Sequence, residues 1–407
     1  MATATTFDYI ARDRSGTTKK GSIEASDRAA VAARLREMGF APVAVDERKE
    51  SALKKELTIP GFGPKVGLKD LAVFSRQFAT MINSGLSLVR ALNILVDQVD
   101  NRRLGEILGE VRTQIEQGRS LSEALADYKE FPPLYIAMVR AGEVAGMLDS
   151  VLLRVADTLE KDLELRRRIK SAMTYPVVVL IMAIVLTIVM LMFIVPVFVG
   201  MFESLGGTLP LPTRLLLALS DFVRSMWYLL FILPIVGWQA FKYARKRPRV
   251  RHAIDALKLK VPVFGQLFHK VALARFTRNF GSLLRAGVPI LMSLEITAQT
   301  ANNGVIADAV AEVQASVREG ESVARPLAHH PVFPSMVVQM MAVGEETGAM
   351  DEMLVKIADF YDDEVTALTE SLTAMLEPLM IGVLGGIVGA MVIALYMPMF
   401  KIFELIQ

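Results

Sequence analysis

The segment FSRQFATMINSGLSL begins at Phe74, and a related segment, FTRNFGSLLRAGVPI, begins 202 residues later at Phe276. The same offset continues without a gap through the following helical stretch and into an apolar run. Identical residues at this offset include the pairs Arg76/Arg278, Phe78/Phe280, Gly85/Gly287, Asn101/Asn303, Gly118/Gly320 and Pro176/Pro378. A fixed period of this kind indicates an internal duplication.

Each copy is predicted to be helical. Residues 68–82 place apolar side chains at helical spacing, and Gly85 is a typical stop signal after them. Further helices are expected at 87–98 and 104–117, and Ser120 is predicted to cap the helix that follows. A last helix from Leu148 to Lys170 is expected to continue into the apolar run, so each copy is a bundle of about six helices.

Two uncharged runs are long enough to cross a membrane. The first has its core at Pro176–Gly200, and the second covers Pro378–Phe400. A bilayer core of about 30 Å requires roughly 20 helical residues. A weaker apolar stretch, 215–241, is expected to form one long helix and a further span, which gives three spans in total.

Basic residues predict the orientation of these spans. Arg166, Arg167, Arg168 and Lys170 precede the first span, and a cluster from Lys242 to Arg251 follows the middle one. Because Lys and Arg accumulate on the cytoplasmic side, both clusters are expected in the cytoplasm. The N-terminus is then cytoplasmic, the short loop after the first span is external, and the C-terminus is external.

The fold class that follows is mainly α: duplicated helical bundles, three transmembrane helices and a small N-terminal α+β domain with ββαβ order. The expected segments are the N-terminal domain (1–49), a linker (50–66), the first cytoplasmic helical domain (67–172), transmembrane helix 1 (173–201), an external loop (202–214), transmembrane helix 2 (215–242), the second helical domain (243–375) and transmembrane helix 3 (376–401).

Composition excludes several functions. The 407 residues include no cysteine and four histidines, and the formal net charge is +2. The lack of cysteine excludes disulfides, thiolate metal sites and cysteine nucleophiles. The balanced charge argues against a nucleic-acid-binding protein, which should show a concentrated basic face. The sequence contains no phosphate-binding loop and no HExxH motif, so we expect no catalytic residue, no cofactor and no metal. His329 and His330 are interpreted as an exposed pair at a helix end.

The clearest repeated polar motif is G-E-x-x-G-x-x-D. It contains Gly142, Glu143, Gly146 and Asp149 in the first copy and Gly344, Glu345, Gly348 and Asp351 in the second. In one interpretation it contacts a partner or a divalent cation. In the other it is structural: the glycines form a turn, and Asp149 or Asp351 caps the next helix by accepting backbone N–H bonds.

The last apolar run contains small residues at close-packing spacing, namely Gly382, Gly385, Gly386 and Gly389. Such a stripe allows helix backbones to approach closely, so we expect a packing role. Glu377 precedes this run and is expected either to reach the membrane interface or to anchor another helix.

These motifs resemble the type II secretion F-domain family, which includes the platform proteins of type IV pilus and type II secretion machines. The resemblance covers the whole chain, including the stretch from Phe7 to Ala25 and both Gly-Glu motifs. It implies an inner-membrane platform for pilus assembly that contacts a cytoplasmic assembly ATPase, pilin subunits, other inner-membrane assembly proteins, the lipid bilayer and further copies of itself.

The alternative within this family is the F protein of a type II secretion system. Two other classes of function remain, a transporter and a membrane-tethered signalling adaptor. A transporter requires a polar pathway within the membrane, and the two long runs show almost none. An adaptor leaves the gapless duplication unexplained.

Overall fold

The computed structural model describes residues 5–12, 18–25, 28–47, 65–203, 210–245, 247–262 and 264–405. The chain divides into two units, Met1–Lys65 and Val66–Gln407. Residues 50–64 of the expected linker and 204–209 of the expected external loop lie outside the described residues.

The first unit contains three strands and one helix: β1 (Thr5–Arg12), β2 (Thr18–Ala25), α1 (Arg28–Glu37) and β3 (Ala41–Glu47). The strands form an antiparallel sheet in the order β2-β1-β3. Phe7 and Ala11 of β1 are buried with Val31 and Leu35 of α1, so the helix covers one face of the sheet.

The second unit begins with the first helical copy. Its elements are α2 (Leu68–Asn83), α3 (Leu88–Gln98), α4 (Arg102–Glu116), α5 (Leu121–Ala126), α6 (Pro133–Ala145) and α7 (Leu148–Val189). Aromatic rings form the centre of its core: Phe74 lies against Phe78 and Phe131, which in turn meets Tyr135. Burial of these large apolar side chains is the main contribution to the stability of the bundle.

The second copy follows the same plan. After α11 (Pro248–Lys260) come α12 (Phe264–Arg285), α13 (Ile290–Thr300), α14 (Gly304–Arg318), α15 (Ala324–Leu327), α16 (Ser335–Thr347) and α17 (Met350–Leu405). Helices α13, α14 and α16 begin and end 202 residues after α3, α4 and α6, so the duplication in the sequence is also a duplication of helices. Phe276, Phe280 and Phe333 repeat the aromatic contacts of the first core.

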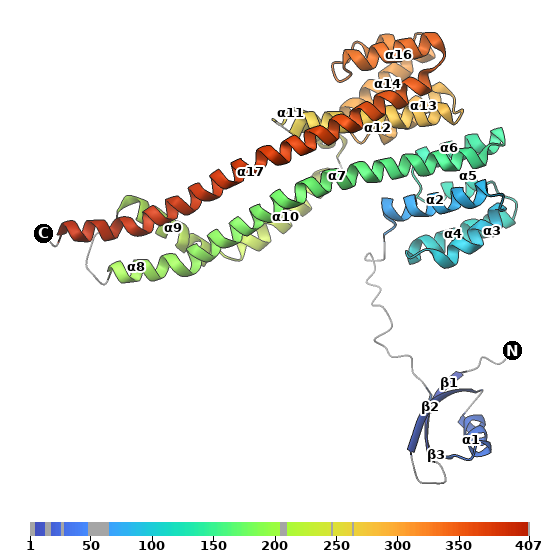
Figure 1. Ribbon diagram of the computed structural model, residues 1–407, viewed down its shortest axis with the longest axis horizontal. Helices are drawn as coiled ribbons and strands as arrows, with labels where there is room; N and C mark the ends of the chain where they lie inside the picture. The colour runs from blue at the N-terminus through green and yellow to red at the C-terminus, as the bar shows by residue number, and fades with distance from the viewer. Residues whose placement is uncertain are drawn as a thin grey trace. The chain divides into compact units, whose positions relative to one another are not determined.

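Two continuous helical segments connect the bundles to the apolar runs. Helix α7 continues through a π-helical turn, η1 (Met190–Ile194), into α8 (Val195–Glu203), and α17 has 56 residues. These segments, Leu148–Phe198 and Met350–Pro398, are the two that are long and apolar enough to cross a membrane within the described residues. Figure 1 shows them leaving the two bundles in the same direction.

The expected single helix over 215–241 is wrong. The chain forms α9 (Leu211–Ser225) and α10 (Leu229–Ala244), which are separated by Met226, Trp227 and Tyr228. Helix α9 is tied to the two long segments, because the hydroxyl of Thr213 donates to the Ala394 carbonyl oxygen at 2.6 Å and that of Ser220 to the Leu191 carbonyl oxygen at 2.5 Å. These bonds fix α9 against the two long segments, and the chain resumes as a separate helix at Leu229.

The two bundles pack directly on each other. Leu283, Ala286, Val288 and Ile296 of the second copy belong to the core of the first. Along the two long helices, Lys161 Nζ lies 2.6 Å from Asp359 Oδ1, and Arg168 Nη1 donates to the Thr366 hydroxyl at 2.8 Å. Both pairs are 198 residues apart, four fewer than the repeat offset.

Candidate functional site

Glu143 binds the N-terminus of another helix in its own copy. It lies on α6, and its Oε1 and Oε2 atoms accept the backbone N–H groups of Leu121 (2.5 Å) and Ser122 (3.2 Å) at the start of α5. Ser120 is the N-cap residue of α5, as predicted, and its hydroxyl accepts the Glu123 N–H at 3.2 Å. The first N–H groups of a helix have no partner within it, so Glu143 satisfies two that Ser120 does not reach.

Glu345 has the same role in the second copy. Its carboxylate accepts the N–H of Val323 at 2.9 and 3.0 Å and that of Ala324 at 3.3 Å, at the start of α15. The recurrence of Gly-Glu therefore has a structural explanation, although the cap is a glutamate from a neighbouring helix. A role of Glu143 or Glu345 in contacting a partner stays a prediction.

The glycines of the motif allow a close turn between two helices. A Cβ atom at Gly142 would lie 3.0 Å from Val151 Cβ on α7, and one at Gly344 would lie 2.9 Å from Met350 Cα. Gly146 and Gly348 end α6 and α16 with φ of 66° and 73°, a region that side chains disfavour. The first glycine therefore permits close packing and the second reverses the chain.

The predicted capping role of Asp149 is wrong. The N-cap residue of α7 is Met147, which makes no side-chain capping bond, and Asp149 lies within the first turn. Its charge there is favourable to the helix dipole without a direct bond. Asp351 accepts a hydrogen bond from Arg285 Nε at 3.2 Å and so connects α17 to α12.

The described residues contain no group of three or more metal-ligating side chains. Of the two adjacent histidines, His330 is paired with Glu312, with its Nε2 3.4 Å from Oε2.

A second polar cluster, not predicted from the sequence, lies where α7 meets α12 and α17. Arg275 Nε donates to Asp162 Oδ1 at 2.8 Å, and the hydroxyl oxygens of Thr158 and Ser282 are 3.0 Å apart. Arg154 of α7 donates to the backbone carbonyl of Arg285. Burial lowers the pKa of Arg275, which the nearby Asp162 opposes. Arg278, the second member of the recurring Arg76/Arg278 pair, lines the same cleft as Arg154, Thr158 and Ser282, so that pair is the sequence signal nearest to this cluster.

Within the described residues, the glycine stripe of α17 packs against no other helix. A Cβ atom at Gly382, Gly385, Gly386 or Gly389 would meet nothing within 4 Å. The stripe thus stays a predicted packing surface for another helix. Glu377 is exposed and lines an open cleft of about 660 Å³ that Arg168 also lines.

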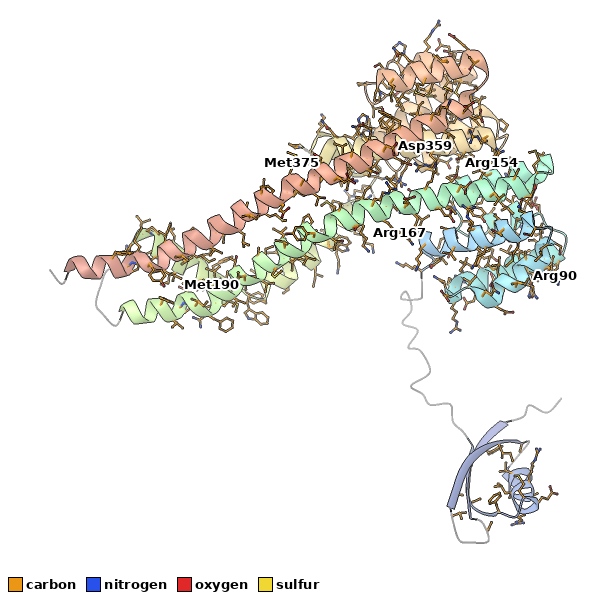
Figure 2. The ribbon with its side chains drawn as sticks, in the orientation of Figure 1. Arg90, Arg154, Arg167, Met190, Asp359 and Met375 are labelled. Atoms are coloured by element: carbon orange, nitrogen blue, oxygen red, sulfur yellow. The ribbon has the colours of Figure 1, made fainter. Side chains whose placement is uncertain are left out.

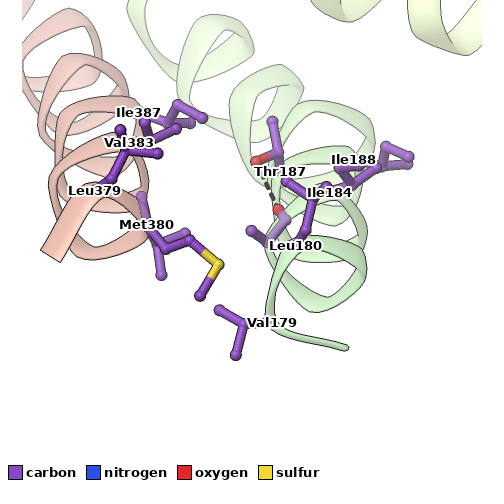
Figure 3. Close-up of a pocket in the computed structure, with 11 residues that line it drawn as sticks. Val179, Leu180, Ile184, Thr187, Ile188, Leu379, Met380, Val383 and Ile387 are labelled. Carbon is purple, nitrogen blue, oxygen red and sulfur yellow. Dashed lines mark hydrogen bonds between the residues drawn. The ribbon is translucent and has the colours of Figure 1, made fainter. Parts of the chain in front are cut away.

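An apolar groove separates the long segments further along. It has a volume of about 320 Å³ and is lined by α7 residues between Val179 and Ile188 and α17 residues between Leu379 and Ile387 (Figure 3). The hydroxyl of Thr187 is already bonded to the Ala183 carbonyl at 2.8 Å, as the dashed line in Figure 3 shows. The groove therefore offers no polar pathway along its lining.

Comparisons with known proteins agree with this architecture. The family model described as type II secretion system protein F matches residues 74–196 and again 276–398, and the model of its N-terminal domain matches residues 1–46. The chain is 46% identical over 402 residues to "Type IV pilus assembly protein PilC" of Myxococcus xanthus, covering 98% of this chain and 96% of the relative. It is 46% identical to the protein of that name from Thermus thermophilus, covering 97% and 98%. "Type II secretion system protein F" of Pseudomonas aeruginosa is 34% identical, covering 98% and 99%.

Proposed function

Because the chain belongs to the type II secretion system protein F family, we propose that it is the inner-membrane platform of a type IV pilus assembly machine. It is a structural platform and not an enzyme. The pilus assignment is supported by the higher identity to the two PilC relatives, 46% against 34% for the secretion protein.

The observation that carries the mechanism is the continuity of the long helices. Helix α7 and helix α17 each begin in a bundle and continue without a break into an apolar segment. Pro176 and Pro378 each remove one backbone bond near the start of the apolar segment, but the helix continues through both positions. A displacement of the bundle along the helix axis is therefore transmitted to the apolar segment. The platform thus couples a cytoplasmic assembly ATPase to pilin subunits held in the membrane.

The proposed topology has three crossings. The first is α7 with α8, the second is α9 with α10, and the third is α17. Helix α10 alone has 16 residues, about 24 Å at 1.5 Å per residue, so α9 is required for the middle crossing. The N-terminal α+β domain is cytoplasmic and the C-terminus is external.

The proposed partners are the assembly ATPase, pilin, other inner-membrane assembly proteins, lipid and further copies of this chain. The glycine stripe of α17 is proposed as a packing surface for a transmembrane helix of one of these protein partners.

The test is to delete the gene and restore it with variants, while counting surface pili and measuring secreted protein. Deletion is expected to abolish pili and leave secretion intact. Loss of secretion with normal pili would instead support the secretion F protein, the second candidate, whose relative matches over nearly the whole chain.

A variant tests the mechanical role directly. A flexible Gly-Ser insertion between Lys170 and Ser171 interrupts α7 at the base of its apolar segment. We expect normal membrane abundance and no pili. The matched control is the same insertion within residues 50–64, which should leave pili normal. Normal pili from the first insertion would refute rigid coupling through α7.

A further inference from the structure

The two copies bind equivalent arginines in different ways. In the first copy, Arg76 Nε donates to Glu160 Oε1 at 2.8 Å, and its Nη2 binds both Glu160 and Asp157. In the second copy, Arg278 stands at the position of Arg76 and binds Asp362, which stands at the position of Glu160. The remaining acid, Asp359, stands at the position of Asp157.

Asp359 does not bind Arg278. Its Oδ1 atom lies 2.6 Å from Lys161 Nζ on α7 of the first copy. The acid that completes the arginine site in one copy is therefore used in the other to hold the two copies together. Figure 2 labels Asp359 on α17, which runs beside α7 in this region.

Arg278 is left incompletely satisfied by this arrangement. It is 4% exposed, and its Nε and Nη1 atoms have no hydrogen-bond partner, nor does Asp362 Oδ1. Unpaired buried polar atoms, and charged ones above all, cost free energy in the folded state. Arg76 illustrates the alternative, because its site contains both acids.

The pKa values of the acids in the two sites are shifted in opposite directions. Hydrogen bonds from Arg76 lower the pKa of Glu160. Burial raises the pKa of Asp362, although Arg278 opposes this shift. The second site therefore stabilises its ionised acid less well than the first.

The geometry allows the acid to change partner. Arg278, Lys161 and Asp359 all line one polar cleft of about 320 Å³ between α7, α12 and α17. The side chains of Lys161 and Asp359 are about half exposed, so each has room for other rotamers. Asp359 precedes Asp362 by three residues, the spacing that brings Asp157 and Glu160 to one arginine.

We propose that Asp359 is a two-position switch between the copies. In the docked position it binds Lys161 and holds α17 against α7. In the released position it binds Arg278, as Asp157 binds Arg76, and the contact between the bundles is loosened. The proposal rests on the platform function proposed above, to which the two positions give two arrangements of the bundles. The test of the switch does not depend on pilus assembly.

The absence of cysteine in the chain makes a direct measurement possible. A Thr158→Cys/Ser282→Cys double variant places two thiols where hydroxyl oxygens are 3.0 Å apart, across the docked contact. In purified full-length protein in nanodiscs, the rate of disulfide formation under mild oxidant reports how often the bundles are docked.

Two further substitutions in this background distinguish a switch from a simple ion pair. Lys161→Ala leaves Asp359 free to bind Arg278, so the rate should fall about fivefold, which corresponds to about 1 kcal/mol. Asp359→Asn removes the carboxylate that binds Lys161 in the docked position and Arg278 in the released position. Both positions are then weakened, so the rate of disulfide formation should fall clearly less than in Lys161→Ala. A simple ion pair requires the two variants to behave alike.

Lys356→Ala is the matched control, because Lys356 pairs with Glu352 on α17 itself, 3.0 Å away. It should leave the rate unchanged, and circular dichroism should show the same helix content in every variant. Equal rates for Lys161→Ala and Asp359→Asn, or no effect of either, would overturn the switch while leaving the platform function intact.

Discussion

Replacing Glu143 tests how much its cap on α5 contributes to the stability of the bundle. The carboxylate of Glu143 accepts two backbone N–H bonds, at 2.5 and 3.2 Å, and the side chain is half-buried. Hydrogen bonds to charged groups contribute about 1.5–3 kcal/mol, and loss of an N-cap costs about 0.5–2 kcal/mol. Glu143→Ala should therefore lower the free energy of unfolding by about 2 kcal/mol. Glu143→Gln should cost about half as much, since its amide oxygen still accepts one bond.

The assay is thermal unfolding of the purified protein followed by circular dichroism. The two bundles pack on each other and are treated as one unfolding unit of roughly 150–250 residues, for which about 2 kcal/mol lowers the Tm by roughly 4–8 °C. Glu345→Ala should behave similarly, because Glu345 accepts the N–H groups of Val323 and Ala324. Glu346→Ala is the control, since Glu346 is the exposed neighbour and should leave the Tm unchanged.

Pilus counts on the same cells separate the two interpretations of the motif. If capping is the whole role, Glu143→Lys lowers pilus number in proportion to folded protein. An unchanged Tm for both Glu143→Ala and Glu345→Ala would refute the capping argument. An unchanged Tm with loss of pili in Glu143→Lys would establish a partner contact instead.

Three further predictions concern packing, pH and topology. Gly142→Ala should destabilise the protein by about 1–3 kcal/mol, since its Cβ would lie 3.0 Å from Val151. Gly109→Ala is the control, because a Cβ in the middle of α4 would meet nothing within 4 Å, and it should be neutral or stabilising. Equal changes in Tm for the two variants would contradict this prediction. Arg76 lowers the pKa of Glu160, so the stability from this pair is present above the ordinary glutamate pKa and is lost as the pH falls. Glu160→Gln should therefore flatten the acid side of a curve of Tm against pH. Identical curves for the variant and the unchanged protein would argue against this reasoning. Single cysteines placed after Met1 and before Gln407 should react with an impermeant thiol reagent on intact spheroplasts only at the C-terminal position, and labelling of both or neither would remove one crossing.

Local signals in the sequence were sufficient to predict the bundle helices. The apolar spacing of residues 68–82 and the stop at Gly85 correspond to α2, which ends at Asn83. The predicted continuation of the helix from Leu148 into the apolar run is confirmed by α7. These features depend on residues a few positions apart, so periodicity and capping rules are enough to find them.

The remaining features depend on tertiary contacts. Glu143 reaches Leu121, 22 residues earlier in the chain, and no local pattern indicates such a bond. The break between α9 and α10 contains neither glycine nor proline, so no local signal in the sequence indicates it. The bonds that fix Thr213 and Ser220 of α9 on other helices are likewise tertiary. The partnership of Lys161 with Asp359 likewise arises only when the two copies pack together.

The 198-residue spacing of two contacts between α7 and α17 means that the two helical copies are staggered along these helices. The repeat offset is 202, so each contact joins a residue to the position one helical turn before its own equivalent. At 1.5 Å per residue, the second bundle is displaced by about 6 Å along the helices relative to the first. A flat partner surface approaching from the bundle end therefore meets the first copy one step before the second. The bundle ends of the two copies thus lie at different positions along the helix axes, and a symmetric partner contacts first one copy and then the other.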